Sequence, residues 1–263
     1  MERKDRMEKV IAVIQARMGS TRLPRKVMLD LSGKPVLWHV VKRIQGSKLL
    51  DEIIVATSED SSNDVIREFC AEHQIKCYSG SEEDVLDRFF QAARALKLEP
   101  QNLVVRITAD CPLIDPDVVD QTIGALKQHQ VDYASNTINP TYPDGLDCEV
   151  MTFSSLQRAW QEAKMRSERE HVTPYIYKHP ELFTLLNVTN SEDLSSFRLT
   201  LDQEEDYKLI EWIYLNLYKE NNLFLMDEIL DLLKRHPEKS GINLAIKRNE
   251  GLFKSVKNDE RVQ

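Results

Sequence analysis

The sequence predicts an α/β protein built on a doubly wound, mostly parallel sheet. Over the first 135 residues, short apolar runs rich in β-branched residues alternate with amphipathic helical patterns. This alternation is typical of consecutive strand–helix units in a parallel sheet. The chain has 263 residues, of which 41% are hydrophobic and 30% charged, so it is large enough for one α/β domain with a full core.

The elements of this first part follow one another in a regular order. The first expected strand is Val10–Ile14, and Pro35 begins an amphipathic helix that continues to Gly46. Further strands are expected at 53–56, 75–78 and 103–107, with helices at 63–74 and 82–97 between them. Asp115 and Pro116, as N-cap and first helical residue, begin the next helix.

The regular alternation ends after residues 132–135. A turn-rich segment at 139–145 precedes an expected strand of different direction at 146–151. The remaining expected elements are a helix at 153–165, a polar interruption at 167–173, strands at 183–188 and 197–201, helices at 204–219 and 226–235, and a frayed polar tail after Gly251. We therefore expect a single domain over residues 1–263, with residues 136–200 inserted as a lid or accessory region.

Charge and composition exclude several functional classes. The 43 acidic residues outnumber the 35 basic ones, giving a formal net charge of −8, whereas nucleic-acid-binding proteins normally carry a basic surface. The apolar run after the charged N-terminus is too short for a signal peptide or a membrane span. The four cysteines (70, 77, 111 and 148) lack zinc-site spacing and are expected to be free thiols. We expect a cytoplasmic protein with no nucleic-acid or membrane partner.

The loop after the first strand carries the strongest functional pattern. It carries Arg17, Arg22 and Lys26, and the small residues among them include Gly19 and Ser20. Open α/β sheets bind ligands at the carboxyl ends of their strands, where this loop lies. Small residues let backbone N–H groups approach phosphate oxygens, and the cations neutralise a polyphosphate. The alternative is a solvated basic loop, since neither a Walker A loop nor a G-x-G-x-x-G fingerprint is present.

The same loop resembles the signature of a known family. Residues 15–26 are Gln-Ala-Arg-Met-Gly-Ser-Thr-Arg-Leu-Pro-Arg-Lys, similar to the cytidylyltransferases that activate acylneuraminate and 3-deoxy-octulosonate. Other stretches match in the same order, at 33–35, 54–57, 80–88, 106–116, 144–149, 169–175 and 199–202. The branch that the chain resembles most is the spore-coat polysaccharide cytidylyltransferases. One residue departs from the pattern: Arg25 stands where the family usually has glycine.

The resemblance implies a fold, a reaction and partners. The fold is of the nucleotide-diphospho-sugar transferase type, with residues 136–200 binding the acceptor and forming dimer contacts. The reaction transfers CMP from CTP to a nonulosonic or octulosonic sugar acid and releases pyrophosphate, for surface or spore-coat polysaccharide synthesis. The implied partners are CTP and a small acidic sugar, the implied cofactor is Mg²⁺, and the implied assembly is a homodimer.

The resemblance also implies site residues. The nucleotide-binding set is Gln15, Ala16, Arg17, Gly19, Ser20, Arg22, Lys26, Ser79, Gly80 and Asp110, of which Arg17, Lys26 and Asp110 are catalytic. The acceptor-binding set, in an irregular region of the kind that often carries function, is Asn136, Asp144, Asp147, Glu149 and His171. The Mg²⁺ ligands are Asp110 and Asp202, since hard cations prefer carboxylate oxygens.

Structural roles stay open for several of these residues. Asp110 could cap the turn before Pro112, and Asp202 could form a helix-capping pair with Glu205. Ser81, next to Ser79 and Gly80, could cap a helix. His171 could have a structural role and not that of a general base. For the whole protein the alternatives are a glycosyltransferase and a non-catalytic nucleotide-binding protein. The first is disfavoured because the expected strand at 103–107 is not followed by Asp-x-Asp. The second stays open because of Arg25.

Overall fold

The central strand β1 (Val10–Gln15) shows why the chain folds into three layers. In a computed structural model, which describes residues 8–262, Val10 to Ile14 are all buried. Val10, Ala12 and Ile14 belong to one apolar cluster, and Ile11 and Val13 belong to another. Because successive side chains of a strand point to opposite faces, an unbroken apolar run requires helices on both faces.

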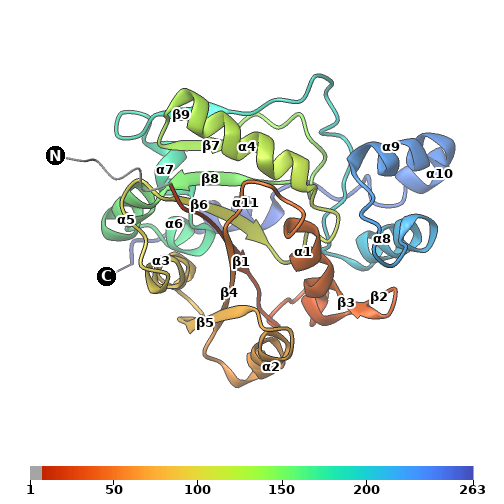
Figure 1. The fold of residues 1–263 in the computed structure, drawn as a ribbon, viewed down its shortest axis with the longest axis horizontal. Coiled ribbons are helices and arrows are strands. Elements are labelled where there is room, and N and C mark those ends of the chain that lie inside the picture. The colour runs from red at the N-terminus through yellow and green to blue at the C-terminus, as the bar shows by residue number, and fades with distance from the viewer. Residues whose placement is uncertain (1–7, 263) are drawn as a thin grey trace.

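Seven strands form one sheet, in the order β5, β4, β1, β6, β8, β7 and β9 (Figure 1). The four parallel strands are β1, β4 (Glu52–Ser58), β5 (Lys76–Gly80) and β6 (Leu103–Thr108). β8 (Glu149–Thr152) is antiparallel to β6 and to β7 (Tyr133–Ser135), which pairs in parallel with β9 (Leu185–Asn187). The predicted doubly wound, mostly parallel sheet is confirmed, including the strand of different direction. β8 and β9, from residues 136–200, are strands of this main sheet.

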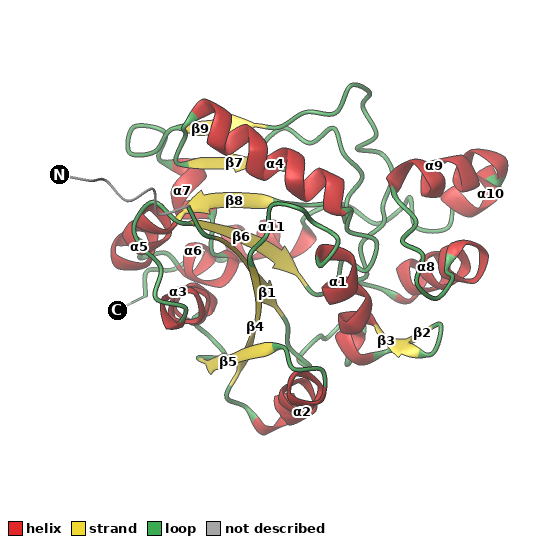
Figure 2. Cartoon of the chain, in the orientation of Figure 1, coloured by secondary structure: helices red, strands yellow, loops and turns green. Residues whose placement is uncertain are grey.

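Helices cover both faces of the sheet (Figure 2). The cluster on one face includes residues of α1 (Val36–Ile44), α2 (Asp64–Glu72) and α4 (Pro116–His129). The cluster on the other includes residues of α3 (Val85–Ala95), α5 (Phe153–Glu162) and α7 (Pro174–Lys178), and α6 (Arg166–His171) packs beside α3. Within residues 8–262, no helix is both long and apolar enough to span a membrane.

A third apolar cluster lies at one end of the molecule. It is formed largely by α8 (Glu204–Leu217) and α9 (Met226–Arg235), and it includes residues next to the short pair β2 (Asp30–Leu31) and β3 (Lys34–Pro35). The remaining elements are η1 (Lys26–Met28), η2 (Ser61–Asn63), α10 (Pro237–Ser240) and α11 (Glu250–Lys257). All four cysteines are free, as predicted.

Two segments after residue 165 are more ordered than the sequence predicted. The polar stretch at 167–173 is mostly helical, because it contains most of α6. The tail after Gly251, expected to fray, forms most of α11 and packs against α6. Ser255 accounts for part of this order, since its hydroxyl donates to Glu170 at 2.9 Å and lies 3.1 Å from His171 Nε2. Tertiary contacts with a distant helix supply the order that the polar local sequence does not predict.

Two other predictions were wrong in detail. The expected strand at 197–201 forms only an isolated bridge between Arg198 and Asp144, because its main chain bonds to Asp144 and Asp110, neither of which lies in a strand. The helix expected from Glu82 begins at Val85, and its N-cap is Asp84, not Ser81. The Asp84 carboxylate accepts from the Asp87 N–H at 2.9 Å, which satisfies a free donor of the first turn.

Candidate functional site

The loop after β1 is held by its own main chain and by its neighbours. The Ala16 N–H donates to the Ala56 carbonyl at 3.0 Å, and the Met18 N–H donates to Asn63 Oδ1 at 2.8 Å. The loop ends where Arg25, at φ 59° and ψ 21°, serves as N-cap of η1. That left-handed conformation explains why glycine suits this position, since only glycine adopts it without steric cost. The Arg25 side chain is exposed.

Replacing Arg25 by glycine is expected to raise the free energy of unfolding by roughly 0.5–1 kcal/mol. The left-handed strain of a residue with a Cβ is relieved, and the greater freedom of glycine in the unfolded chain offsets part of that gain. Urea unfolding of the two proteins measures the difference. Arg25→Ala is the control, because it removes the same charge but keeps the strain. An equal gain in both variants would show that charge, not backbone conformation, is responsible.

Lys26 joins two carboxylates that are far apart in the sequence. Its Nζ lies 2.6 Å from Asp110 Oδ2 and 2.7 Å from Asp202 Oδ1. Asp110 follows β6 and Asp202 precedes α8, so three separate segments meet at the carboxyl end of the sheet. Burial by itself raises the pKa of Asp110, but the ion pair with Lys26 outweighs it and lowers the pKa to about 2. The Asp110 carboxylate is therefore ionised at neutral pH.

The helix-capping alternative for Asp202 is wrong. The N-cap of α8 is Gln203, and the side chain that caps it is Asp206, which accepts from the N–H groups of Asp202 and Gln203 at 2.9 and 3.0 Å. The Asp202 carboxylate instead binds three cations, Lys26, Arg22 at 2.9 Å and Arg198 at 3.2 Å. Asp202 therefore belongs to the same cluster as Lys26 and Asp110, and these three side chains are called the charged centre below.

Like Lys26, the two loop arginines Arg17 and Arg22 are paired with carboxylates. Arg17 lies 3.3 Å from Glu82 Oε1, and Arg22 contacts both Asp202 and Glu250, the latter at 3.3 Å. The Arg17–Glu82 and Arg22–Glu250 pairs are well exposed to solvent, so their net contribution to stability is small. An incoming polyphosphate would compete with these carboxylates for the same guanidinium groups.

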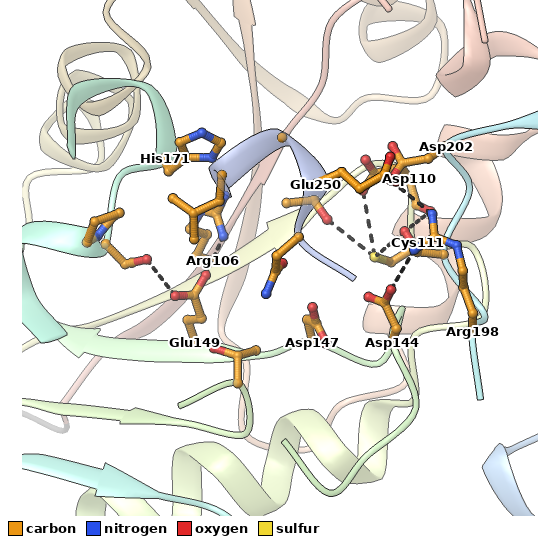
Figure 3. Close-up of a pocket in the computed structure, with 18 of the residues that line it drawn as sticks. Arg106, Asp110, Cys111, Asp144, Asp147, Glu149, His171, Arg198, Asp202 and Glu250 are labelled. Carbon is orange, nitrogen blue, oxygen red and sulfur yellow. Dashed lines mark hydrogen bonds and ion pairs between the residues drawn. The ribbon is translucent and has the colours of Figure 1, made fainter. Parts of the chain in front are cut away.

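A cavity of about 450 Å³ lies next to this charged centre (Figure 3). The predicted site residues among its lining are Arg22, Asp110, Asp144, Asp147, Glu149, His171 and Asp202. Asn136 lies apart from this lining. It is fully buried, its Nδ2 donates to the Leu146 carbonyl at 2.8 Å, and its Oδ1 accepts from the Cys148 N–H at 2.9 Å. These bonds brace the loop that carries Asp144 and Asp147.

A second cavity, of about 1010 Å³, opens beside the start of α3. Arg17, Ser81 and Glu82 line it, together with residues of α6. Ser79 and Gly80 end β5 just before this point and are not among the lining residues. Gln15 and Ala16 end β1 and lead into the loop, also outside both linings. Each cavity is bordered by one cation of the loop, the first by Arg22 and the second by Arg17.

Three arginines that the sequence analysis did not select hold the acidic residues of the first cavity. Arg106 pairs with Glu149, which also accepts from the hydroxyls of Tyr133 and Thr173 at 2.5 and 2.6 Å. Arg198 pairs with Asp144 at 2.7 Å, and Arg248 pairs with Asp147. Arg106 could have been found from the sequence, because a charged residue inside a buried apolar strand indicates a buried partner of opposite charge. No local signal marks Arg248.

Burial shifts the pKa values of Asp147 and His171, two of the titratable groups of the cavity. Burial raises the pKa of Asp147 to about 7, an effect that Arg248 opposes and Asp144 reinforces. Burial lowers the pKa of His171 to about 4, so its imidazole is neutral at pH 7. His171 lies in α6 with its Nε2 against Ser255. The Asp147 carboxyl group therefore changes charge near neutral pH.

The family is decided by a comparison with known sequences. The family model described as cytidylyltransferase matches residues 11–232. This chain belongs to the cytidylyltransferase family. The matched span includes the loop after β1, Asp110, Asp202 and the cavity residues 144, 147 and 149, and it ends before α10 and α11.

The chain is also similar to individual proteins and to a solved structure. An uncharacterised protein of Methanocaldococcus jannaschii is 41% identical over 89% of this chain and 94% of its own length. The spore coat polysaccharide biosynthesis protein SpsF of Bacillus subtilis is 33% identical over 88% and 97%. A 3-deoxy-manno-octulosonate cytidylyltransferase of Polynucleobacter necessarius is 39% identical over 46% of each chain. A cytidylyltransferase structure from Leptospira borgpetersenii has 30% identity and a TM-score of 0.82, covering 88% and 96%.

The donor atoms of this cytidylyltransferase suit a magnesium–phosphate complex and not a self-sufficient metal site. Within residues 8–262, no group of three or more His, Cys, Asp or Glu side chains is arranged to hold a metal ion. Mg²⁺ commonly takes only one or two protein carboxylates and completes its shell with phosphate oxygens and water. Asp110 and Asp202, which share the Lys26 ammonium, provide such a pair.

Proposed function

We propose that this cytidylyltransferase transfers CMP from CTP to a sugar acid of the nonulosonic or octulosonic type, releasing pyrophosphate. The observation that carries the proposal is the meeting of Lys26, Asp110 and Asp202 beside the loop cations at the carboxyl end of the sheet. The similarity to a 3-deoxy-manno-octulosonate cytidylyltransferase and to a spore coat polysaccharide biosynthesis protein supports the choice of acceptor and of pathway.

In the proposed reaction, a hydroxyl of the acceptor attacks the α-phosphorus of CTP and releases its proton to water. The bond from the α-phosphorus to the oxygen bridging to the β-phosphate breaks, and pyrophosphate leaves with that oxygen. Arg17, Arg22 and Lys26 donate hydrogen bonds to the phosphate oxygens and stabilise the charge on the leaving group. The small residues Gly19 and Ser20 let the loop backbone approach the triphosphate, and Ser79 and Gly80 lie toward the nucleoside.

The cofactor in this proposal is Mg²⁺, with Asp110 and Asp202 as its protein ligands. When bound, it would supply positive charge at the phosphate oxygens. The carboxylate of Asp110 is ionised, and that of Asp202 is bound by cations. Asp202 does not cap α8, because Asp206 does so, and both carboxylates can therefore serve as ligands. Lys26, held between them, orients both oxygens before the nucleotide arrives.

The acceptor is proposed to bind in the cavity lined by Asp144, Asp147, Glu149 and His171. Carboxylates are strong hydrogen-bond acceptors, and sugar hydroxyls are donors.

Residues 136–200, which carry this set, are also proposed to form the contacts of a homodimer. Sedimentation equilibrium would show the monomer mass alone if this second part is wrong.

Pyrophosphate release tests the proposed reaction. Each of the four nucleoside triphosphates is combined with a panel of nonulosonic and octulosonic acids, and we expect release only with CTP and a sugar acid. A glycosyltransferase would instead consume a nucleotide-sugar, and a non-catalytic nucleotide-binding protein would bind CTP without turnover. Release with another nucleotide and no release with CTP would contradict the cytidine specificity.

Replacing Glu82 by glutamine is expected to lower the KM for CTP about two- to fivefold. Glu82 competes with the triphosphate for Arg17, and an exposed ion pair of this kind contributes roughly 0.2–1 kcal/mol. Initial-rate kinetics at saturating acceptor measure the change. Glu83→Gln is the matched control, because Glu83 is an exposed acid that lines the same cavity and forms no ion pair with Arg17. A higher KM in Glu82→Gln would mean that Glu82 assists binding of the nucleotide.

A further inference from the structure

The C-terminal segment, residues 248–262, lines both cavities of the site. Asn249, Glu250, Gly251 and Leu252 line the cavity of about 450 Å³. Glu260, Arg261 and Val262 line the cavity of about 1010 Å³. This segment follows the span that the cytidylyltransferase model matches, which ends at residue 232. A part of the chain outside the matched family region therefore forms walls of the candidate active site.

From Ser255 onward, the segment is bound to α6 and to Lys164 just before it. The Ser167 N–H and hydroxyl donate to the Asp259 carboxylate at 2.9 and 2.6 Å. Arg166 pairs with Glu260 at 2.8 Å, and the Val262 N–H donates to the Lys164 carbonyl at the same distance. These contacts, together with those of Ser255, fix the position of the segment relative to the acidic cavity.

Arg248 connects the C-terminal segment to two acidic residues of the cavity. Its guanidinium pairs with Asp147 Oδ1, lies 3.7 Å from Asp144 Oδ1 and donates to the Tyr142 carbonyl at 3.3 Å. The Arg248 side chain is only 17% exposed, so these contacts are shielded from solvent. Within residues 8–262, the other oxygen of Asp147, Oδ2, has no hydrogen-bond or ion-pair partner.

The geometry makes Oδ2 of Asp147 an open acceptor in the cavity. One oxygen of the carboxylate is held by the half-buried guanidinium of Arg248, which fixes the plane of the group. The second oxygen belongs to a residue of the lining and is available to a donor in the cavity. Figure 3 shows Asp147 between Glu149 and Asp144, with Glu250 across the cavity from them. A polyol is the ligand class whose hydroxyls match such an acceptor.

We propose that Arg248 is a positioning residue for the acceptor. It holds Asp147, and with it Asp144, so that Asp147 receives a hydrogen bond from an acceptor hydroxyl, and the C-terminal segment completes the acceptor subsite. This inference rests on the proposed function, because it assumes that the acidic cavity binds the acceptor. Glu250 of the same segment pairs with Arg22, so the C-terminal segment and the loop after β1 are in direct contact.

Arg248→Gln tests the proposal in the full-length protein. We expect the KM for the sugar-acid acceptor to rise about 10- to 100-fold, the loss that follows from disturbing one hydrogen bond to a charged group. The KM for CTP should stay within about twofold, since Arg248 contacts none of the loop cations. Arg248→Lys should restore part of the acceptor affinity, because a single ammonium pairs with one carboxylate but lacks the guanidinium fork. Lys247→Gln, an exposed change of the same charge next in the chain, is the control.

The pH profile supplies a readout that a purely structural role would not change. Arg248 opposes the rise in the pKa of Asp147, so its removal should move the acid limb of kcat/KM for the acceptor to higher pH. The other charged groups that act on Asp147 are Asp144, Glu149 and Arg106, which the substitution leaves in place.

The outcomes separate this inference from the proposed function. Wild-type protein that transfers CMP to no acceptor contradicts the proposed function. Active wild-type protein with unchanged acceptor KM and pH profile in Arg248→Gln contradicts the positioning role. An equal rise in both KM values, with no rescue by lysine, also contradicts it, because that pattern indicates a general loss of structure.

Discussion

Replacing Asp110 by asparagine is expected to lower kcat/KM for CMP transfer about 100- to 1,000-fold, a loss typical of removing one electrostatic contact to a transition state. Asp110 is one of the two carboxylates proposed to carry Mg²⁺, and it shares the Lys26 ammonium with Asp202. Asparagine has nearly the same size but no charge. The proposed metal site would then have one carboxylate, and charge on the phosphate oxygens would be less well neutralised.

Folding should be much less affected than turnover by this substitution. Lys26 keeps its ion pair with Asp202 at 2.7 Å, so no buried cation is left without a partner. We expect the free energy of unfolding to fall by only about 1–2 kcal/mol, the size of one weakened hydrogen bond to a charged group. Urea unfolding and steady-state kinetics at ordinary Mg²⁺ concentration provide the two measurements.

A matched control removes another carboxylate that has one cationic partner. Asp64→Asn breaks an exposed pair with Arg67 and should leave both kcat/KM and stability close to wild type. Wild-type activity in Asp110→Asn would sink the metal assignment. A stability loss large enough to explain the lower activity would instead assign Asp110 a structural role.

The sheet could be predicted from the sequence because its signals are local. Val10–Ile14 is an unbroken apolar run, and such a run can be satisfied only between two layers. The strand of different direction at 146–151 was also detectable, since the turn-rich segment before it interrupts the strand–helix alternation. The loop after β1 carried a pattern of cations and small residues that the fold places at the carboxyl end of the sheet.

The partners of the site residues could not be predicted in the same way. Glu205 and Asp206 both lie in the first turn of α8, and which one caps it depends on how the chain enters the helix. Arg198 was assigned to an expected strand, but it is the common partner of Asp144, Asp202 and Asp206. Such groupings depend on tertiary packing, which leaves no periodic signal in the sequence.

The C-terminal segment shows the limit of local prediction most clearly. Its composition is polar, so a frayed tail was the reasonable expectation. Its order depends on contacts with α6 and on Arg248, whose partner Asp147 lies about one hundred residues earlier in the chain. A helix that is stable only when docked cannot be recognised from its own residues.

Replacing Gly145 by alanine is expected to lower the free energy of unfolding by about 3–5 kcal/mol, the sum of backbone strain and overpacking in a closed site. Gly145 has φ +106°, which residues with a Cβ rarely adopt. An added Cβ would lie 2.4 Å from the Leu199 carbonyl carbon and 2.5 Å from the Thr200 nitrogen. Both contacts are with backbone, so no side-chain rotation can relieve them.

The displaced backbone leads directly to the charged centre. The Leu199 N–H donates to the Asp144 carbonyl at 2.6 Å, and the Leu201 N–H donates to the Asp110 carbonyl at 2.8 Å. Moving residues 199–201 therefore shifts Asp202 relative to Asp110 and Lys26. We expect the folded fraction of Gly145→Ala to show a lower kcat, because catalysis here depends on alignment of charged groups.

A second glycine supplies the control for this substitution. Gly124 lies within α4, and a Cβ there would meet nothing within 4 Å. Gly124→Ala should stabilise the protein by up to about 1 kcal/mol, since alanine is the better helix former. Thermal and urea unfolding of both variants give the comparison. If Gly145→Ala lowered the free energy of unfolding by less than about 1 kcal/mol, the chain at 199–201 could move aside at little cost. The close contact at Gly145 would then not hold Asp202 in place, contrary to this prediction.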